Sequence, residues 1–316
     1  MAEMEKNFPI PEITTLAPFI ENREDFSRFL EYFGKNIPKW AEISVSPQNE
    51  TIGIMTKGEG QEFAGVVCDY LNKCGVEPEK AEQCRRIAAL FEDAPLLVKA
   101  DFGREILFDF TMYWQVPVSL PGIFPLIGAA GVSAETIAFF RESSLLMRSE
   151  NVFFGLGFEG ADRMGFKVFF SNPLNNCMEF LMPAVASVMT GAGLSANAVN
   201  HFIGFHNYLS EKAVGKLFTS LTVGSKPPQS VKLDYEIIPP DYAIEIMKAL
   251  GHGDAQEERL KMVMNTLGMR NLTYIGIKFE PGDKFSLKFY FDIRNSSYLS
   301  ESGEMLADYL KNSVWR

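Results

Sequence analysis

The sequence predicts an α+β fold in which ten antiparallel strands close into a barrel ringed by helices. The first observation is a rhythm of five predicted hairpins separated by helical regions, at a period of roughly 55 to 65 residues. The second is a lysine that recurs at one phase of this rhythm, as Lys167, Lys232 and Lys288. A sheet of ten strands usually closes or splits, and helices must cover one of its faces. We therefore expect residues 1–22 to be an N-terminal lead-in and residues 23–316 a single barrel domain.

Each hairpin is predicted from alternating apolar residues on both sides of a turn signal. The predicted hairpins span residues 40–57, 96–114, 152–171, 217–238 and 272–293. Asp101, Phe102 and Gly103 spell a kinase triplet, but they stand in the predicted turn of the second hairpin. No glycine-rich phosphate loop accompanies them, so a kinase or nucleotide-binding function loses its support.

The segments between the hairpins have the spacing of amphipathic helices. Helices are predicted within residues 23–33, 61–92, 121–147, 175–214, 241–267 and 302–314, with a break at residues 75–78. Residues 8–21 carry three prolines and predict an extended lead-in.

Composition limits the possible partners. The net charge of −10 disfavours nucleic acid and anionic membrane surfaces as partners. No apolar run of about 18 residues is present to span a membrane, and the N-terminus lacks the apolar core of a secretory signal. We therefore expect a cytoplasmic protein with reduced cysteines. The three histidines are too poorly spaced to predict a metal site.

Alternation assigns one face of every strand to the helices and the other to the barrel lumen. One part of the expected lumen is cationic, and another is aromatic and rich in glycine. Such a pocket suits a ligand with an anionic head and an apolar body. The expected lumen residues of the first strands are Glu42, Ser44, Lys99, Phe153, Gly155, Gly157, Phe218, Ser220, Thr222, Tyr274, Gly276 and Lys278; those of the second strands are Thr51, Gly53, Met55, Leu107, Asp109, Thr111, Lys167, Phe169, Ser171, Lys232, Asp234, Glu236, Lys288, Tyr290 and Asp292.

Over residues 40–315, the five-fold rhythm and the repeated Lys-x-aromatic strand resemble the aromatic prenyltransferases of the ABBA fold, also called the PT barrel. This resemblance implies transfer of a short isoprenoid, dimethylallyl or geranyl, from its diphosphate to an electron-rich aromatic acceptor, in secondary metabolism. It assigns diphosphate binding to Lys167, Lys232, Lys278 and Lys288. Tyr274, Tyr290 and Phe169 would shield the prenyl cation, Phe153 and Phe218 would complete the pocket, and Glu42 would act as the base. With so many lysines no cofactor is obligatory, although Mg²⁺ could help, and we expect a monomer.

The sequence departs from the family pattern at several positions. Phe169 and Asp234 replace common tyrosines, Thr51 replaces an expected arginine, and Leu107 stands where another cation often lies. Lys278, Lys99 or Arg104 could complete the diphosphate site. The chain is also short for the indole-prenylating branch, which favours the compact branch that acts on phenols.

Two other functions remain open. A barrel that binds a lipophilic anion without chemistry would have the same lumen but would tolerate loss of Glu42. An oligomeric tunnelling fold acting on a pterin or purine would need a metal or acid cluster, which the sequence does not show. Each lysine by itself is also typical of a solvated strand face. Asp109, Asp234, Glu236 and Asp292 are interpreted as lysine partners rather than catalysts.

Overall fold

The computed structural model describes the chain in thirteen segments. They are residues 11–37, 40–48, 50–91, 94–103, 108–129, 132–149, 151–161, 163–171, 178–210, 217–223, 230–238, 240–268 and 272–292. The predicted helix at residues 302–314, and the positions of Arg104 and Leu107, lie outside these segments.

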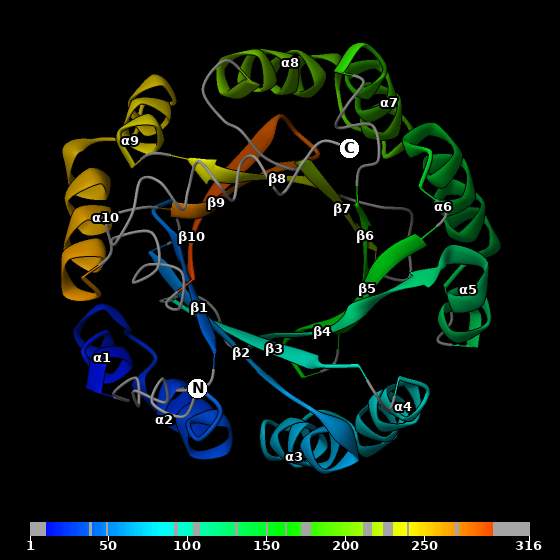
Figure 1. The fold of residues 1–316 in the computed structure, drawn as a ribbon, viewed down its shortest axis with the longest axis vertical. Coiled ribbons are helices and arrows are strands. Elements are labelled where there is room, and N and C mark those ends of the chain that lie inside the picture. Colours follow the sequence, from blue (N-terminus) through cyan, green and yellow to red (C-terminus); the bar gives the residue numbers. More distant parts are fainter. Residues whose placement is uncertain are drawn as a thin grey trace, which may run out of the picture.

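Ten antiparallel strands form one closed barrel, which confirms the predicted fold class (Figure 1). Each strand pairs with its neighbours in the sequence, and β1 closes the ring by pairing with β10. The strands are β1 (Ala41–Ser46), β2 (Thr51–Gly58), β3 (Leu96–Phe102), β4 (Asp109–Ser119), β5 (Asn151–Glu159), β6 (Arg163–Ser171), β7 (Leu217–Val223), β8 (Ser230–Ile238), β9 (Leu272–Glu280) and β10 (Lys284–Asp292).

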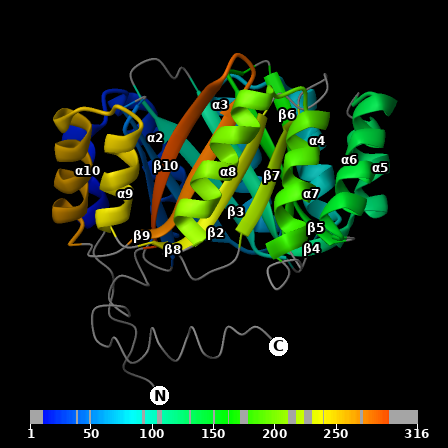
Figure 2. The same ribbon diagram turned by 90° about the horizontal axis from the view of Figure 1, so that it is seen from above.

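Helices surround the barrel on its outside, and most follow a hairpin as a pair (Figure 1). The view at right angles shows the strands crossing obliquely between helices that flank them (Figure 2). The helices are α1 (Pro11–Thr14), the 3₁₀ helix η1 (Ala17–Phe19), α2 (Arg23–Phe33), α3 (Gly60–Lys73), α4 (Pro78–Ala89), α5 (Leu120–Ala129), α6 (Ala134–Met147), α7 (Met178–Gly191), α8 (Ala196–Ser210), α9 (Pro240–Ala249) and α10 (Asp254–Thr266).

The hydrophobic core lies between the barrel and its ring of helices. Phe33 of α2 contacts Phe110 of β4, with 6.1 Å between their ring centroids, and Tyr70 of α3 packs against both rings. Ile52 and Ile54, which face outward on β2, are fully buried in this layer. Because the apolar side chains of each strand pack against the helices, the side chains that alternate with them line the lumen.

Side chains extend the seam where β1 meets β10. Backbone pairing there covers only Glu42–Val45 on the β1 side. Beyond it, Ser46 Oγ donates to the carbonyl of Leu287 at 3.0 Å, and Gln48 Oε1 accepts from the amide of Leu287 at 2.6 Å. Gln48 thus continues the ladder into the β1–β2 turn and helps to hold the barrel closed.

Two predictions of local structure were wrong. The lead-in is not extended over Pro11–Phe19, because Ile13, Leu16 and Ile20 are buried in the core and the intervening chain coils into α1 and η1. The strand predicted to end at Trp114 continues to Ser119 after a register shift between Trp114 and Val118. Pro117 lies in this irregular stretch, where a residue without an N–H is tolerated.

Candidate active site

A carboxylate from β3 joins two lysines inside the barrel. The Nζ of Lys288 on β10 lies 2.8 Å from Asp101 Oδ2, and the Nζ of Lys99 on β3 lies 3.3 Å from the same oxygen. Strands β3 and β10 are separated by β1 and β2 in the sheet. The contact between Lys288 and Asp101 therefore crosses the lumen and fixes the direction of both side chains.

Two further lysines extend the cationic surface. Lys232 donates a hydrogen bond to Asp234, and its Nζ lies 4.6 Å from the ring centroid of Tyr290. Lys167 donates to the hydroxyl of Thr111 at 2.8 Å. These contacts place cations from β3, β6, β8 and β10 on the inner surface of the barrel.

Burial and mutual charge set the protonation of the lysine cluster. Burial lowers the pKa of Lys99 to about 7, against the attraction of Asp101, and the neighbouring Lys288 and Lys232 lower it further. Burial also opposes the charge of Lys288, yet Asp101 and Asp109 raise its pKa above the ordinary value. Asp101 is the counterpart: burial alone would raise its pKa, but Lys288 and Lys99 hold it well below the usual range. Lys99 is therefore the cation of this cluster that is most easily neutralised near pH 7.

Aromatic rings border the cations. Tyr290 has Lys232 over its ring and the Nζ of Lys99 at 5.3 Å from its centroid, and Tyr274 meets it edge to face at 6.3 Å. On the other side of the lumen, Tyr113 of β4 meets Phe169 of β6 edge to face at 5.3 Å. Electron-rich ring faces next to a cationic surface can stabilise positive charge that develops beside an anion.

Glycines on intervening strands make these contacts possible. A Cβ on Gly276 would lie 2.7 Å from Lys232 Cε, and one on Gly53 would lie 2.0 Å from Asp101 Oδ1. On β5, a Cβ at Gly155 would meet Tyr113 at 2.7 Å, and one at Gly157 would meet Lys167 at 3.2 Å. Each of these glycines lets a side chain from a neighbouring strand pass over it.

The cations and the aromatic residues predicted for the site occupy different levels of the lumen. In this antiparallel barrel all hairpin turns lie at one end, and all connections through helices lie at the other. We name these the hairpin end and the helix end. The cations lie either at the middle of their strand, as Lys99, Lys167 and Lys288 do, or nearer the hairpin end, as Lys232 and Lys278 do. The carboxylate and aromatic residues predicted for the site lie in the half nearer the helix end: Glu42, Phe153, Phe169, Phe218, Tyr274 and Tyr290.

The structure brings most of the predicted site residues together. Glu42 is only 6% exposed, and its charge acts on both Lys232 and Tyr290. Phe153 pairs with Phe169 across β5 and β6. Phe218 pairs with Asp234 in the sheet, but its side chain lies outside the described part of the chain.

Lys278 lies beside Lys232 in the sheet but pairs with a different carboxylate. It is 33% exposed and pairs with Glu280 at 2.6 Å, close to the hairpin end. Sequence reasoning also missed two lumen residues, Asp101 and Tyr113. Both follow an expected lumen residue by two positions, Lys99 and Thr111, so extending the alternation would have found them. Asp101 is a strand residue of β3 and does not belong to the turn.

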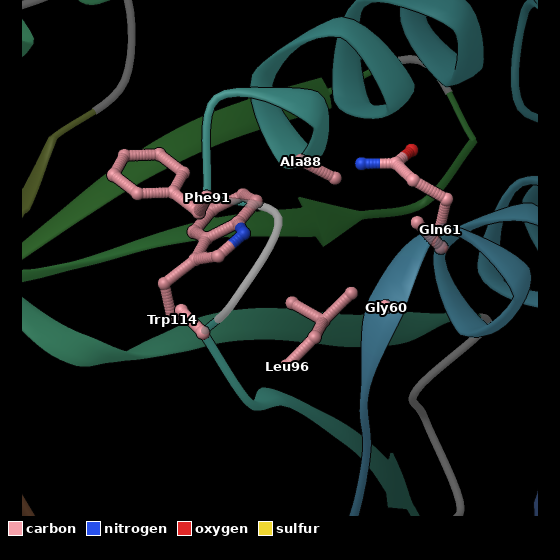
Figure 3. A pocket seen from close by; sticks show the side chains of 8 residues that line it. Gly60, Gln61, Ala88, Phe91, Leu96 and Trp114 are labelled. Atoms are coloured by element: carbon pink, nitrogen blue, oxygen red, sulfur yellow. The ribbon is translucent and has the colours of Figure 1, made fainter.

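A hollow outside the barrel is a poor candidate for the site. It has a cavity volume of about 10 Å³ and lies between α3, α4 and the strands β3 and β4 (Figure 3). Its lining consists of Gly60, Gln61, Ala64, Ala88, Phe91, Ala94, Leu96 and Trp114. Without an ionisable side chain, this hollow offers no general acid, base or charged ligand for chemistry.

Within the described residues, no group of three or more His, Cys, Asp or Glu side chains is arranged to hold a metal ion. The same residues include no helix with the length and apolarity needed to cross a membrane.

Solved structures of prenyltransferases superpose on this chain. PriB, in ternary complex with L-tryptophan and dimethylallyl thiolodiphosphate, superposes with a TM-score of 0.62 at 11% identity, covering 91% of this chain and 95% of PriB. The 5-dimethylallyltryptophan synthase from Streptomyces coelicolor gives 0.64 at 10% identity, with 89% and 95% covered. The 6-dimethylallyltryptophan synthase from Micromonospora olivasterospora, in complex with DMASPP and Trp, gives 0.64 at 11% identity, with 91% and 96% covered. No protein family model and no curated protein sequence matches the chain.

These comparisons correct one expectation. Chain length was taken to favour the compact branch that acts on phenols, yet tryptophan prenyltransferases match this chain over 95% and 96% of their own length. Length is therefore no argument against an indole acceptor. The closed ten-stranded barrel, its helical ring and these superpositions together show that the chain has the ABBA barrel fold of aromatic prenyltransferases.

Proposed function

We propose that this protein is an aromatic prenyltransferase that moves a short isoprenoid from an allylic diphosphate to an electron-rich aromatic carbon. The observation that carries the proposal is the order of side chains along the lumen, with lysines from the middle of the barrel to the hairpin end and the predicted aromatic rings with Glu42 toward the helix end. A prenyl diphosphate has the same two parts. Its anionic head would lie among the lysines, and its allylic carbon would lie beside Tyr290.

The lysines supply what the leaving group needs. When the C–O bond of the donor breaks, its electron pair stays on the diphosphate, whose negative charge increases. Lys167, Lys232 and Lys288 would stabilise this charge. Their electrostatic effect is stronger than in bulk water because the lumen is partly desolvated. Lys99 joins them in place of the arginine expected at Thr51, while Lys278 would meet the outer edge of the diphosphate.

The aromatic rings and Glu42 serve the second half of the reaction. The allylic cation would lie between the faces of Tyr290, Tyr274 and Phe169, each contributing about 2 kcal/mol or more when dry. An aromatic carbon of the acceptor then attacks this cation and forms the new C–C bond. Glu42 would take the proton that leaves the same carbon, which restores aromaticity. Phe153 and Phe218 would border the acceptor and help to exclude water.

An indole is the first acceptor to test. PriB and the 6-dimethylallyltryptophan synthase were both captured with tryptophan. In this chain Glu42 is buried on the first strand, where the indole branch places its base. We therefore propose L-tryptophan or a related indole ahead of phenols, with dimethylallyl diphosphate as donor.

We further propose that the enzyme needs no obligatory cofactor, because lysines from four strands already supply positive charge at the diphosphate. Turnover that persists in excess EDTA supports this, and turnover that requires added Mg²⁺ contradicts it. We also propose that it acts as a monomer, in the cytoplasm and in secondary metabolism. Support for the monomer comes from the barrel, which a single chain closes.

The decisive experiment combines binding and turnover. Calorimetric titration with dimethylallyl thiolodiphosphate should show binding to the wild type that is lost in Lys232→Ala. Incubation with dimethylallyl diphosphate and L-tryptophan, followed by mass spectrometry, should then show one added dimethylallyl group. Binding without turnover on any indole or phenol would favour the alternative, a barrel that holds a lipophilic anion without chemistry. Absence of binding would refute the proposed donor site.

A further inference from the structure

The carboxylate of Asp101 occupies the position that an anionic ligand of the two nearest lysines would take. Its Oδ2 accepts from Lys288 at 2.8 Å and lies 3.3 Å from Lys99 Nζ. The side chain is 9% exposed and reaches this position by passing over Gly53 of β2. One oxygen atom thus engages two ammonium groups inside the lumen.

The second oxygen of Asp101 is not used in the same way. Within the described part of the chain, Oδ1 is buried and has no hydrogen-bond partner, and the same holds for Ser44 Oγ. Both atoms lie within 2.3 Å of the point where a Cβ on Gly53 would stand, so they are near each other. A small rotation of Asp101 toward β1 would exchange its lysine contacts for a hydrogen bond from the Ser44 hydroxyl.

Charge balance explains why the carboxylate stands there. Lys99, Lys167, Lys232 and Lys288 influence one another electrostatically, and three aspartates on the same surface offset most of their charge: Asp101, Asp109 and Asp234. Unpaired ammonium groups in a desolvated lumen would be costly. While its lysines hold it, Asp101 has a pKa well below the usual range, so it occupies their side of the lumen as a full negative charge.

We propose that Asp101 is a built-in competitor of the donor's diphosphate, a carboxylate that holds Lys99 and Lys288 in the empty barrel and releases them when the diphosphate binds. The inference rests on the proposed function, since it names the site within the lumen where the donor's anion would lie. It also predicts selectivity: a multiply charged diphosphate can displace the carboxylate, whereas a singly charged anion cannot compensate for its loss.

The test uses inorganic pyrophosphate as the probe on the wild-type protein and on Asp101→Asn. The variant keeps the shape of the side chain and removes its charge. We expect it to have a lower Tm without ligand, because two buried lysines lose their partner, and to bind pyrophosphate about tenfold more tightly by calorimetry. Glu77→Gln is the matched control, because it removes one negative charge at a 64% exposed position just before α4, outside the barrel. It should bind pyrophosphate as the wild type does.

Equal or weaker binding by Asp101→Asn would overturn the inference and make Asp101 a residue that merely positions the lysines. Should the variant be too unstable for calorimetry, the Tm increase on adding pyrophosphate decides instead: an increase larger than in the wild type supports the inference, and a smaller or equal one overturns it. The proposed function is judged separately by turnover. If the wild type is active but Asp101→Asn does not bind pyrophosphate more tightly, only the role of Asp101 as a competitor is refuted. If Asp101→Asn binds pyrophosphate more tightly but the wild type shows no turnover, only the proposed reaction is refuted.

Discussion

Gly276→Ala tests whether the lumen depends on side chains that pass over glycines. The new Cβ would lie 2.7 Å from Lys232 Cε and from Asp234 Oδ1, whereas ordinary contact begins at 3.4 Å. Lys232 must therefore retreat by about 0.7 Å, and its ammonium leaves the face of Tyr290, where it now lies 4.6 Å from the centroid. Since a flexible lysine end can move, we expect the fold to survive at a cost of about 1–3 kcal/mol.

The larger effect should be on donor binding. Loss of one well-placed charged hydrogen bond costs about 1.5 kcal/mol or more, which corresponds to at least about tenfold in affinity. Calorimetry with dimethylallyl thiolodiphosphate measures this, and guanidinium unfolding measures stability. Gly65→Ala in α3 is the control: its Cβ would meet nothing within 4 Å, so it should keep donor affinity and gain up to about 1 kcal/mol of stability. Unchanged donor affinity in a folded Gly276→Ala would refute the reasoning.

Three further predictions follow from the same structure. Because the pKa of Lys99 is about 7, its ammonium is present below that pH and is lost above it. Pyrophosphate also gains charge in this range, so calorimetry compares two proteins: the pyrophosphate affinity of the wild type relative to that of Lys99→Met should fall from pH 6 to pH 8. A ratio of affinities that does not change with pH would contradict the assignment. Glu42→Gln should lower kcat by about 10²- to 10⁴-fold while donor binding stays within about twofold, and a kinetic comparison that finds kcat unaltered would remove Glu42 as the base. Gln48→Ala should lower the unfolding free energy by about 1–3 kcal/mol, because the buried amide of Leu287 loses its 2.6 Å acceptor; a denaturation midpoint equal to that of the wild type would show that the seam does not need it.

The local sequence pattern was enough to predict the barrel and the lysines on its inner surface. Strand alternation alone located Lys167, Lys232 and Lys288 on the same face, and the structure brings Tyr290 to the same lumen. Alternation depends only on the strand's own geometry, which is why it can be predicted from sequence.

The pairing of charges could not be predicted in the same way. Lys288 meets Asp101 across two intervening strands, 187 residues away in the chain. Such a partner is determined by register and barrel closure, which no local pattern encodes. Asp101 was moreover assigned to a turn because Gly103 follows it closely, although β3 continues through Phe102.

The separation of lysines from aromatic residues along the lumen also bears on how the substrate preference of such a barrel could change. At the hairpin end, three to six residues join the strands of each pair, as between Glu159 and Arg163, so the lysines lie between the middle of the barrel and a rim of short turns. At the helix end, long connections through pairs of helices frame the aromatic residues, and such connections tolerate changes in length and sequence. Under the proposed function, acceptor preference could therefore diverge through changes in the connections at the helix end, while the lysines that would bind the diphosphate stay unchanged.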